Sequence, residues 1–426
     1  AGTSLRVDIM TDYQSLMASI ATKARAAARQ LAAADDAAKA KALKAAAQAL
    51  RDQSADILAA NAIDVTAGTT AGLSPAMLDR LKLDEARITA MAAAVEQVAV
   101  LADPVGQIID SSTQPNGLQM ARIRVPIGVL GIIYESRPNV TADAAALGLR
   151  SGNAVILRGG SEAVHSNHAI HAAMVQGVTH VGLPADAVQL VPTQDRAVVG
   201  AMLRAKGAID MIIPRGGKSL VARVQDEARV PVLAHLDGIC HSYVHKDADP
   251  EMAQALVVNA KMRRTGVCGA TETLLIDQDY PAPVALISAL LDAGCEVRAD
   301  DILMELDART VSADADDWDT EYLDAVISAC VVSGLDDAIE HIARHGSHHT
   351  DAIITNNADA AARFLAEVDS AIVMHNSSTQ FADGGEFGLG AEIGIATGRL
   401  HARGPVALEG LTTYKWVVRG NGQIRP

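Results

Sequence analysis

The first hundred residues carry apolar positions at the spacing of helix faces. Alanine-rich stretches run over 13–34 and 36–60, and alanine is the strongest helix former. Over 88–98, apolar residues recur every three or four positions. This segment ends before Asp103-Pro104, because the residue before a proline disfavours helical backbone. Residues 12 to about 100 are therefore predicted to be helical.

The pattern then changes to β-rich runs over 105–110 and 118–125, with the turn signal Asn116-Gly117 between them. The connection is longer than that of a minimal hairpin, so we expect a β-ribbon. Long ribbons in an otherwise α/β chain often serve subunit contacts. We interpret this one as an oligomerisation arm.

From Gly128 onward, short apolar runs alternate with helical patterns. This alternation predicts α/β architecture, with two doubly wound parallel-sheet domains covered by helices on both faces. The strands expected in the first series are 128–134, 153–158, 187–191, 208–213 and 230–234, and the helices placed there are 141–150 and 161–176. The strands expected in the second series are 272–276, 325–332, 352–355 and 371–374.

Composition narrows the function classes. Of the 426 residues, 49% are hydrophobic and 20% are charged, which is typical of a globular protein. The net charge of −15 argues against nucleic-acid binding. No apolar run approaches the roughly 20 residues that cross a membrane, and the first residues lack a signal peptide, so we expect a cytoplasmic protein. Four widely spaced cysteines without a CxxC pair argue against disulfides and a zinc site, so we expect no metal.

One cysteine is a candidate nucleophile. Cys268 ends the run Arg263-Arg264-Thr265-Gly266-Val267-Cys268 and is followed by Gly269, a pattern that predicts a tight loop able to present a side chain. The two arginines would favour the thiolate, which is the reactive form. The alternative, a buried and inert cysteine, is the common situation in α/β proteins.

Three further segments have a functional and a structural interpretation. The turn Arg215-Gly216-Gly217-Lys218-Ser219 lacks the first glycine of a P-loop, but its helix start could still face a phosphate. Residues 134–139 follow a buried strand, where parallel sheets meet ligands, but Arg-Pro-Asn is also ordinary turn chemistry. The histidines of 345–349 lie at an expected helix end, and we favour the helix dipole over metal ligation as their explanation.

Dense motifs follow one another along nearly the whole chain from about Tyr13. They lie at 125–134, 135–141, 152–160, 213–217, Cys268 with 272–275, 381–392, 400–405 and 411–416. In these motifs the sequence closely resembles the γ-glutamyl phosphate reductases, also called glutamate-5-semialdehyde dehydrogenases, which belong to the aldehyde dehydrogenase superfamily.

The resemblance implies the NADPH-dependent reduction of L-glutamyl 5-phosphate to L-glutamate 5-semialdehyde and phosphate, in proline biosynthesis. It implies an NADPH-binding domain (1–104 and 126–234), a catalytic domain (235–380) and an oligomerisation arm (105–125 and 400–426), and hence a homo-oligomer. The alternative is another oxidoreductase of the superfamily, acting on a different aldehyde or acyl phosphate. Acyl phosphates hydrolyse readily, so contact with glutamate 5-kinase is a further hypothesis.

The resemblance also implies residue roles. Cys268 would form a thioester, and Asn139 together with the backbone N–H of Cys268 would hold the oxyanion. The residues expected to bind the cofactor are Arg158, Arg215, Gly216, Gly217 and Glu321. The residues expected to bind the anionic groups of the substrate are Arg137, Arg263 and Arg264.

Two departures from the superfamily pattern bear on mechanism. Hydrolytic members carry a general-base glutamate in Glu-Leu-Gly-Gly, whereas this chain has His235-Leu236-Asp237-Gly238. A base that activates water would hydrolyse the thioester, so the replacement supports acyl-phosphate chemistry. Gly269 follows the nucleophile where most members of the family carry asparagine, which leaves the detail of the substrate loop open.

Overall fold

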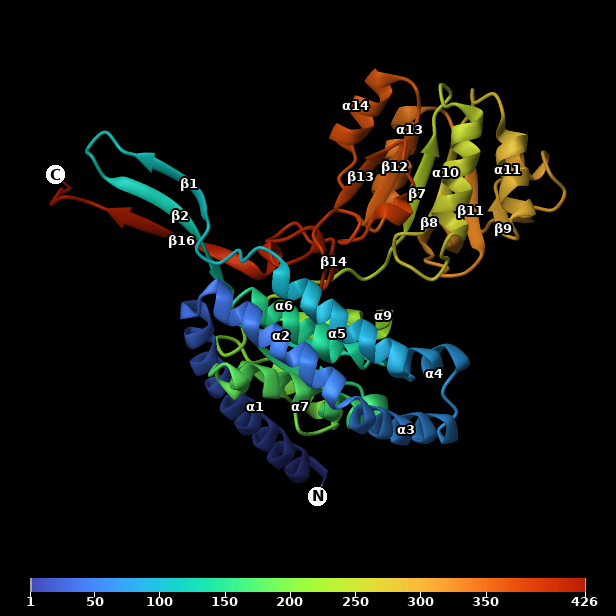
Figure 1. Cartoon of the computed structure of the whole chain (residues 1–426). Coiled ribbons are helices and arrows are strands. Elements are labelled where there is room, and N and C mark those ends of the chain that lie inside the picture. The colour runs from blue at the N-terminus through green and yellow to red at the C-terminus, as the bar shows by residue number, and fades with distance from the viewer. Residues whose placement is uncertain (1, 426) are drawn as a thin grey trace. The chain divides into compact units, whose positions relative to one another are not determined.

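The computed structural model describes the backbone of residues 2–425 and the side chains of residues 12–425. The chain divides into two compact units, each described here by itself. The first unit comprises 1–234, 390–394 and 406–426, and the second comprises 235–389 and 395–405. Figure 1 shows both units with their elements labelled.

The first unit begins with helices, as predicted. The bounds of α1 to α5 are Gly2–Ala33, Asp36–Asp52, Ser54–Thr70, Pro75–Leu81 and Glu85–Val100. Side chains of Asp35, Ser74 and Asp84 cap three of them by accepting a backbone N–H three residues further on. The alanine-rich stretch 36–60 is divided between two helices, because Gln53 leaves helical geometry (φ −98°, ψ 15°) and separates α2 from α3.

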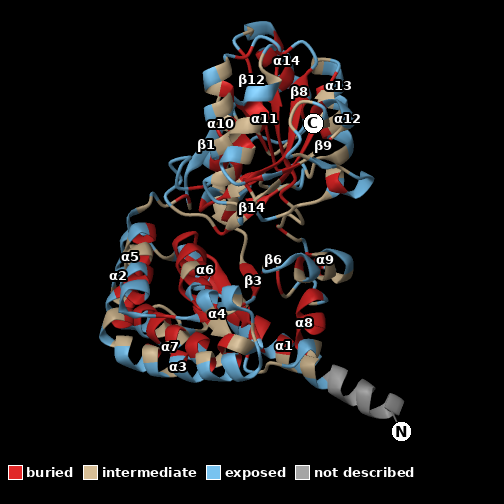
Figure 2. Cartoon of the chain, turned by 90° about the vertical axis from the view of Figure 1, so that its right-hand side faces the viewer, coloured by how far each residue is buried: buried red, intermediate tan, exposed pale blue. Residues whose placement is uncertain are grey.

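A four-stranded parallel sheet with the order β5-β4-β3-β6 forms the core of this unit. Its elements are β3 (Val129–Tyr134), α6 (Asn139–Arg150), β4 (Ala154–Gly159), α7 (Val164–His180), β5 (Val188–Leu190), α8 (Arg196–Leu203), β6 (Met211–Arg215) and α9 (Lys218–Glu227). Every residue of β3 and β4 is buried, and Figure 2 shows buried residues in red on β3 and α6.

One strand expected in this sheet is absent. Residues 230–234 make a single bridge, between Val232 and Ile212, and form no strand. Pro231 explains why pairing does not extend, since it accepts a hydrogen bond from the N–H of Ile212 but has no N–H of its own to donate.

The second unit holds a seven-stranded parallel sheet with the order β10-β9-β11-β8-β7-β12-β13. Its strands are β7 (Cys240–Val244), β8 (Thr271–Asp277), β9 (Glu296–Ala299), β10 (Val311–Ser312), β11 (Val326–Val332), β12 (Thr350–Ile354) and β13 (Ile372–His375). Its helices are α10 (Pro250–Met262), α11 (Pro283–Asp292), α12 (Asp301–Met304), α13 (Leu335–His345) and α14 (Ala358–Glu367).

Two apolar clusters cover the two faces of this sheet. One cluster includes Val257 of α10 and Leu286 of α11, and the other includes Ile342 of α13 and Phe364 of α14. The predicted doubly wound α/β architecture is therefore confirmed. Sequence analysis missed three strands, β7, β9 and β10, of which β9 and β10 are only four and two residues long.

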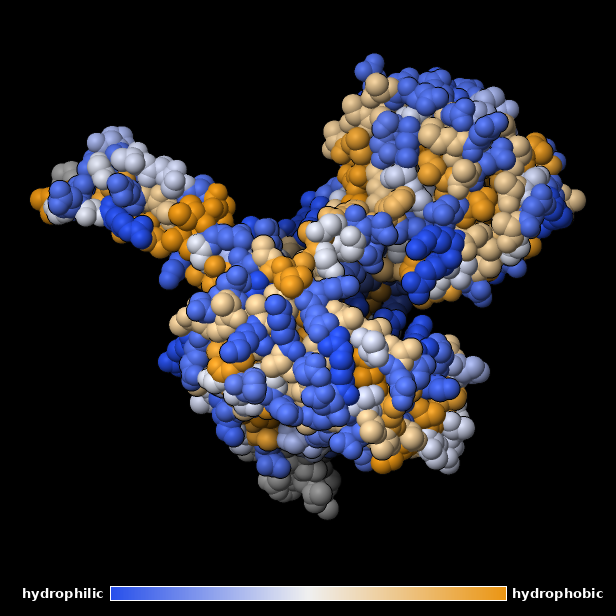
Figure 3. Space-filling model, viewed as in Figure 1, coloured by the Kyte–Doolittle hydropathy of each residue, from blue (hydrophilic) through white to orange (hydrophobic). Residues whose placement is uncertain are grey.

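The predicted ribbon is present, and a strand from residues 400–426, which the resemblance assigned to the same arm, pairs with it. β1 (Ile108–Thr113), β2 (Gln119–Pro126) and β16 (Thr412–Arg419) form an antiparallel sheet with the order β1-β2-β16. The first strand begins later than the expected residue 105. The outer strands β1 and β16 are exposed along most of their length, whereas the central strand β2 is mostly half-buried. Figure 3 shows hydrophobic residues in orange on this arm. A separate two-stranded sheet joins β14 (Gly394–Ala396) to β15 (Gly404–Val406). None of the described helices combines the length and apolarity needed to cross a membrane.

Candidate active site

Three of the predicted site segments of the first unit meet at one edge of its sheet. Tyr134, which ends β3, is paired with Gly159 at the end of β4 and with Arg215 at the end of β6. Arg158 and Arg215 therefore lie at the carboxyl ends of the two strands that flank β3. The carboxyl ends of parallel strands are where such sheets bind ligands.

A small cavity at this edge is lined by residues from distant parts of the chain. It is lined among others by Arg137, Asn139, Asp143, Arg215 and Glu392. Arg137 and Asn139 were predicted to be site residues because they follow β3. Arg215 was predicted to be one from a turn some 75 positions further along the chain. The cavity thus brings together a candidate oxyanion donor and two cationic side chains.

Asn139 is held in place by its own helix. It is the first residue of α6, and its Nδ2 donates a hydrogen bond to Oδ2 of Asp143 at 2.8 Å. Burial raises the pKa of Asp143 to about 6, against the opposing effects of this hydrogen bond and of the Arg215 charge. Sequence analysis missed Asp143, although it lies one helical turn after Asn139 and so on the same face.

The glycine turn after β6 does open a helix, as expected, but a carboxylate already contacts it. The backbone N–H of Gly217, which precedes α9, donates to Oε2 of Glu135 at 3.2 Å. A Cβ atom on Gly216 would lie 2.5 Å from the same oxygen, so a side chain there would displace Glu135. Because Glu135 directly follows β3, this hydrogen bond links the segment after β3 to the turn after β6.

Arg158 is largely buried at the end of β4. Its Nη1 and Nη2 donate to the backbone oxygens of Gly159 and Gln194 at 3.0 and 2.9 Å. Its Nε is buried without a hydrogen-bond partner, and burial lowers the pKa of the guanidinium. The charges of Glu162, Arg196, Glu135 and Arg223 also reach this group, so carboxylates and guanidinium groups both surround it. The unused Nε–H is a donor that an anionic ligand could accept.

In the second unit, Cys268 lies in a turn three residues before β8, as the loop prediction required. β8, β7 and β12 are adjacent and parallel, so their first residues lie at the same edge of the sheet. His235 precedes β7, and His349 precedes β12. The ligand atoms of Cys268, His235 and His349 all lie within 4.8 Å of one another.

Both histidines are fixed through one ring nitrogen. Nδ1 of His235 contacts the backbone oxygen of Ile395 at 2.7 Å, and Nδ1 of His349 contacts Oγ1 of Thr350 at 2.8 Å. The two rings meet edge to face, with centroids 5.1 Å apart. His349 is fully buried, which lowers its pKa to about 3, so its imidazole is neutral at physiological pH.

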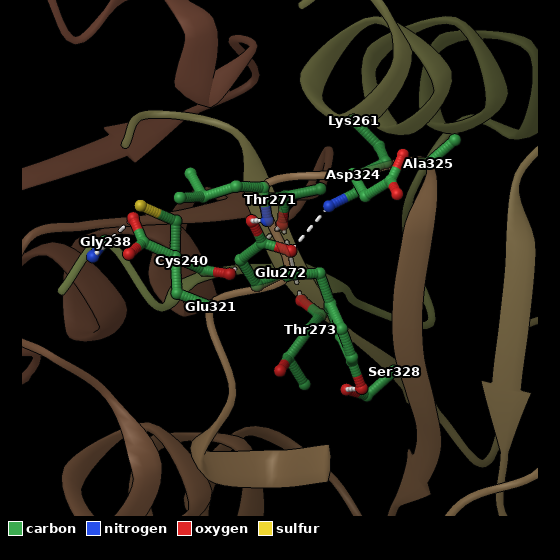
Figure 4. A network of polar contacts seen from close by, with 12 residues as sticks. Gly238, Cys240, Lys261, Thr271, Glu272, Thr273, Glu321, Asp324, Ala325 and Ser328 are labelled. Carbon is green, nitrogen blue, oxygen red and sulfur yellow. Dashed lines mark hydrogen bonds and ion pairs between the residues drawn. The ribbon is translucent and has the colours of Figure 1, made fainter. Parts of the chain in front are cut away.

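Glu321 is tied to the segment that packs on Cys268. Its Oε1 accepts the backbone N–H of Gly238 at 3.0 Å, and Figure 4 shows this contact beside Cys240. Gly238 approaches Cys268 closely, because a Cβ there would lie 2.2 Å from the backbone oxygen of Cys268. The thiol of Cys240 donates to that same oxygen at 3.1 Å.

A buried ion pair supports the loop that carries Glu321. Lys261 Nζ and Glu272 Oε2 lie 2.5 Å apart with both side chains fully buried, as Figure 4 shows. The other oxygen of Glu272 accepts the backbone N–H of Leu323, which has the unusual φ of 53°. Burial raises the pKa of Glu272 to about 7, while the Lys261 charge opposes this rise.

Arg263 and Arg264 are exposed at the end of α10, a few residues before Cys268. Gln380 links this segment to the remainder of the second unit. Its Oε1 accepts a hydrogen bond from Arg263 at 3.5 Å, and its Nε2 donates to the backbone oxygen of Arg264 at 3.1 Å.

Comparison with known proteins decides the family. Residues 8–301 match the sequence model of the Aldehyde dehydrogenase family. Curated proteins called "Gamma-glutamyl phosphate reductase" from Sphingopyxis alaskensis and Novosphingobium aromaticivorans are 70% and 68% identical to this chain over 411 residues. Each alignment covers 96% of this chain, and covers 96% and 97% of the respective relative.

The chain belongs to the γ-glutamyl phosphate reductases of the aldehyde dehydrogenase family. The crystal structure of gamma-glutamyl phosphate reductase from Thermotoga maritima superposes with a TM-score of 0.94 at 43% identity, covering 96% of this chain and all of that one. The resemblance stated from the motifs is therefore confirmed, and so is the aldehyde dehydrogenase-like fold.

Within this γ-glutamyl phosphate reductase chain, His235 and His349 are the neighbours of Cys268 that sequence analysis did not assign to it. His349 belongs to the histidine run interpreted as a helix end. That interpretation suits His345, which ends α13 and contacts Asp319 at 2.8 Å. His349 lies beyond the helix and faces the thiol instead, and its position immediately before a buried strand was the available signal.

Proposed function

We propose that this protein reduces L-glutamyl 5-phosphate to L-glutamate 5-semialdehyde and phosphate with NADPH, through a thioester on Cys268, as a step of proline biosynthesis. One observation carries the choice of nucleophile. Burial raises the pKa of Cys240 well above its ordinary value and the pKa of Cys295 and of Cys330 to about 12. Cys268 is partly exposed in a turn, where a thiolate can form and be reached.

The chemistry divides into two steps. The Cys268 thiolate attacks the acyl carbon, the bond from that carbon to the phosphate oxygen breaks, and a thioester and free phosphate result. NADPH, when bound, supplies the hydride that reduces the thioester carbon. The C–S bond of the resulting thiohemiacetal then breaks, which releases the aldehyde and regenerates the thiolate.

Negative charge develops on the carbonyl oxygen in both steps. We assign its stabilisation to the side-chain amide of Asn139 and the backbone N–H of Cys268. The hydrogen bond from Asn139 to Asp143 supports this role, since a primary amide has two N–H groups and only one is used. The amide plane is thereby fixed before substrate binds.

The residues of the first unit fit a nicotinamide dinucleotide carrying a 2′-phosphate. The buried Nε of Arg158 has no hydrogen-bond partner, and the charges of two arginines and two glutamates act on its guanidinium. A guanidinium fork matches a phosphate well, which favours NADPH over NADH. We assign the pyrophosphate to the turn of Arg215, Gly216 and Gly217, and the nicotinamide ribose to Glu321. We therefore assign NADPH binding to residues 1–104 and 126–234.

Arginines would hold the anionic groups of the substrate. Arg137 is exposed and lines the same cavity as Asn139, while Arg263 and Arg264 are exposed shortly before Cys268. Substrate phosphate and carboxylate groups require such local basic groups in a protein of net charge −15.

The arm supports a homo-oligomer. Tyr414, Trp416 and Val418 alternate along β16 on one face, and each is between 47% and 56% exposed. Exposed aromatic and aliphatic residues in a row are typical of a protein interface. Trp416→Glu is expected to lower the mass measured by light scattering, whereas Lys415→Glu on the opposite face is the matched control. An unchanged mass for Trp416→Glu would reject this role of the arm.

The reverse reaction tests the function directly. L-glutamate 5-semialdehyde should reduce NADP⁺ only when inorganic phosphate is present, and Cys268→Ala should abolish this activity. Oxidation of simple aldehydes in preference to the semialdehyde would instead favour another oxidoreductase of the superfamily. Phosphate-independent turnover, or full activity in Cys268→Ala, would reject the proposal.

A further inference from the structure

The donor set around Cys268 is that of a soft metal site. One thiol and two imidazoles come from the starts of β8, β7 and β12, three neighbouring strands of one sheet, and their ligand atoms lie within 4.8 Å of one another. Thiolate and imidazole are the ligands that Zn²⁺ prefers, and three protein ligands leave a fourth tetrahedral position open. The corresponding ligand-to-ligand distances around Zn²⁺ are about 3.3–3.6 Å, so a small movement of side chains closes the site.

The hydrogen bond that His235 makes through Nδ1 favours metal binding by its other ring nitrogen. The partner of His235 Nδ1 is a backbone carbonyl, which can only accept, so Nδ1 carries the proton and Nε2 keeps its lone pair. A histidine ligand characteristically donates its other N–H to a backbone carbonyl in this way. The contact with Ile395 therefore fixes the orientation of the His235 ring in the way that metal-bound histidines are fixed.

His349 provides an independent observation. Its side chain is fully buried, its Nδ1 contacts Thr350, and its Nε2 has no hydrogen-bond partner. A buried nitrogen without a hydrogen-bond partner destabilises the folded state, so a ligand for this Nε2 is expected. A metal ion bound by Cys268 and His235 would satisfy it.

We propose that Cys268, His235 and His349 form a binding site for Zn²⁺ or a cation of similar softness, and that its occupation reversibly inhibits the protein. Binding forms one metal–sulfur and two metal–nitrogen bonds and releases the thiol proton to solvent. No electron is transferred. Binding itself is independent of the proposed function, whereas the inhibition rests on it, because a metal-bound thiolate is not available to attack an acyl phosphate.

Cobalt is the probe for the site, because a thiolate bound to Co²⁺ gives a ligand-to-metal charge-transfer absorption. Protein freed of metal with a chelator should develop this absorption with one Co²⁺ per chain and lose it when Zn²⁺ is added. Cys268→Ser should lose the absorption. His235→Gln and His349→Gln should each weaken Co²⁺ binding on the order of tenfold or more. His348→Asn, the matched control next to His349, should bind like wild type, since His348 Nδ1 contacts the backbone oxygen of Asp369 instead.

The metal site and the proposed enzymatic activity are tested by different measurements. Zn²⁺ should also protect Cys268 from alkylation by iodoacetamide in wild type and not in His349→Gln, and circular dichroism verifies that each variant is folded. Absence of the absorption in wild type, or unchanged binding in both folded histidine variants, overturns the metal site and leaves the proposed activity standing. Full cobalt binding in a protein without phosphate-dependent activity would support the metal site and overturn the proposed activity.

Discussion

Asn139 donates a hydrogen bond from its side-chain amide to the carboxylate of Asp143, one turn further along the same helix, at 2.8 Å. The contact makes Asp143 a positioning residue for the proposed oxyanion donor. It also connects catalysis to pH, because burial raises the pKa of Asp143 to about 6. An ionised carboxylate accepts the amide hydrogen bond more strongly than a protonated one.

We predict that Asp143→Ala lowers kcat about tenfold with little change in KM, since the amide loses its orientation and not its contact with bound substrate. In wild type, kcat should fall as the pH drops through about 6, where Asp143 becomes protonated. Asp143→Asn, whose side chain does not titrate, should lack this acidic limb. Steady-state kinetics from pH 5 to 8 check both expectations, and equal pH profiles for wild type and Asp143→Asn would contradict them.

The same carboxyl predicts a pH dependence of stability. Its pKa is higher in the folded state, at about 6, than the ordinary value of 3.8. Its contribution to stability is therefore complete below the ordinary value and is lost as the pH rises to about 6. Asp143→Asn should thus gain stability relative to wild type between pH 4 and pH 6 and keep that gain at higher pH. A difference in melting temperature that is constant over this range would show that the carboxyl does not titrate there.

The buried pair of Lys261 and Glu272 predicts an asymmetric response to substitution. Glu272→Gln leaves the Lys261 ammonium buried without a counter-charge and should cost about 3–5 kcal/mol. The double variant Lys261→Met, Glu272→Gln removes that charge and should recover most of the loss. Urea unfolding provides the measurement. Arg344→Gln removes one partner of an exposed pair and is the control, expected to change little. A double variant no more stable than Glu272→Gln would contradict the explanation.

Arg158 should determine the choice of cofactor. Arg158→Gln removes the charge that would meet a 2′-phosphate, so KM for NADPH should rise at least about tenfold while KM for NADH changes little. Arg80→Gln, at an exposed arginine of α4, is the control for a general loss of positive charge. Equal increases for the two cofactors would show that Arg158 does not contact the phosphate.

The candidate ligand edge of the first unit could be predicted because it follows from connectivity. Arg158, Arg215 and Asn139 each lie at or just after the end of a hydrophobic run. Parallel strands joined by right-handed crossovers put those ends on one edge of a sheet. Strands such as β3 are buried and uniformly apolar, so their positions could be recognised in the sequence.

The arrangement around Cys268 was not predicted, and β7 is the reason. Its sequence, Cys240-His241-Ser242-Tyr243-Val244, looks polar, although all five residues are buried. Polar groups of β7 find partners inside the protein, as in the 2.9 Å contact between His241 Nδ1 and Asp351 Oδ1, although His241 Nε2 has none. Without β7, nothing in the sequence placed the starts of β8 and β12 near one another, and His235 and His349 could not be predicted to lie near Cys268.

Acylation of Cys268 tests the proposed thioester mechanism directly. Protein incubated with L-glutamate 5-semialdehyde and NADP⁺ without phosphate should form one NADPH per active site and then stop. Mass spectrometry should find one glutamyl group in thioester linkage on the peptide that contains Cys268, and added phosphate should discharge it. No adduct on Cys268, or an adduct that forms equally in Cys268→Ser, would contradict the proposed mechanism.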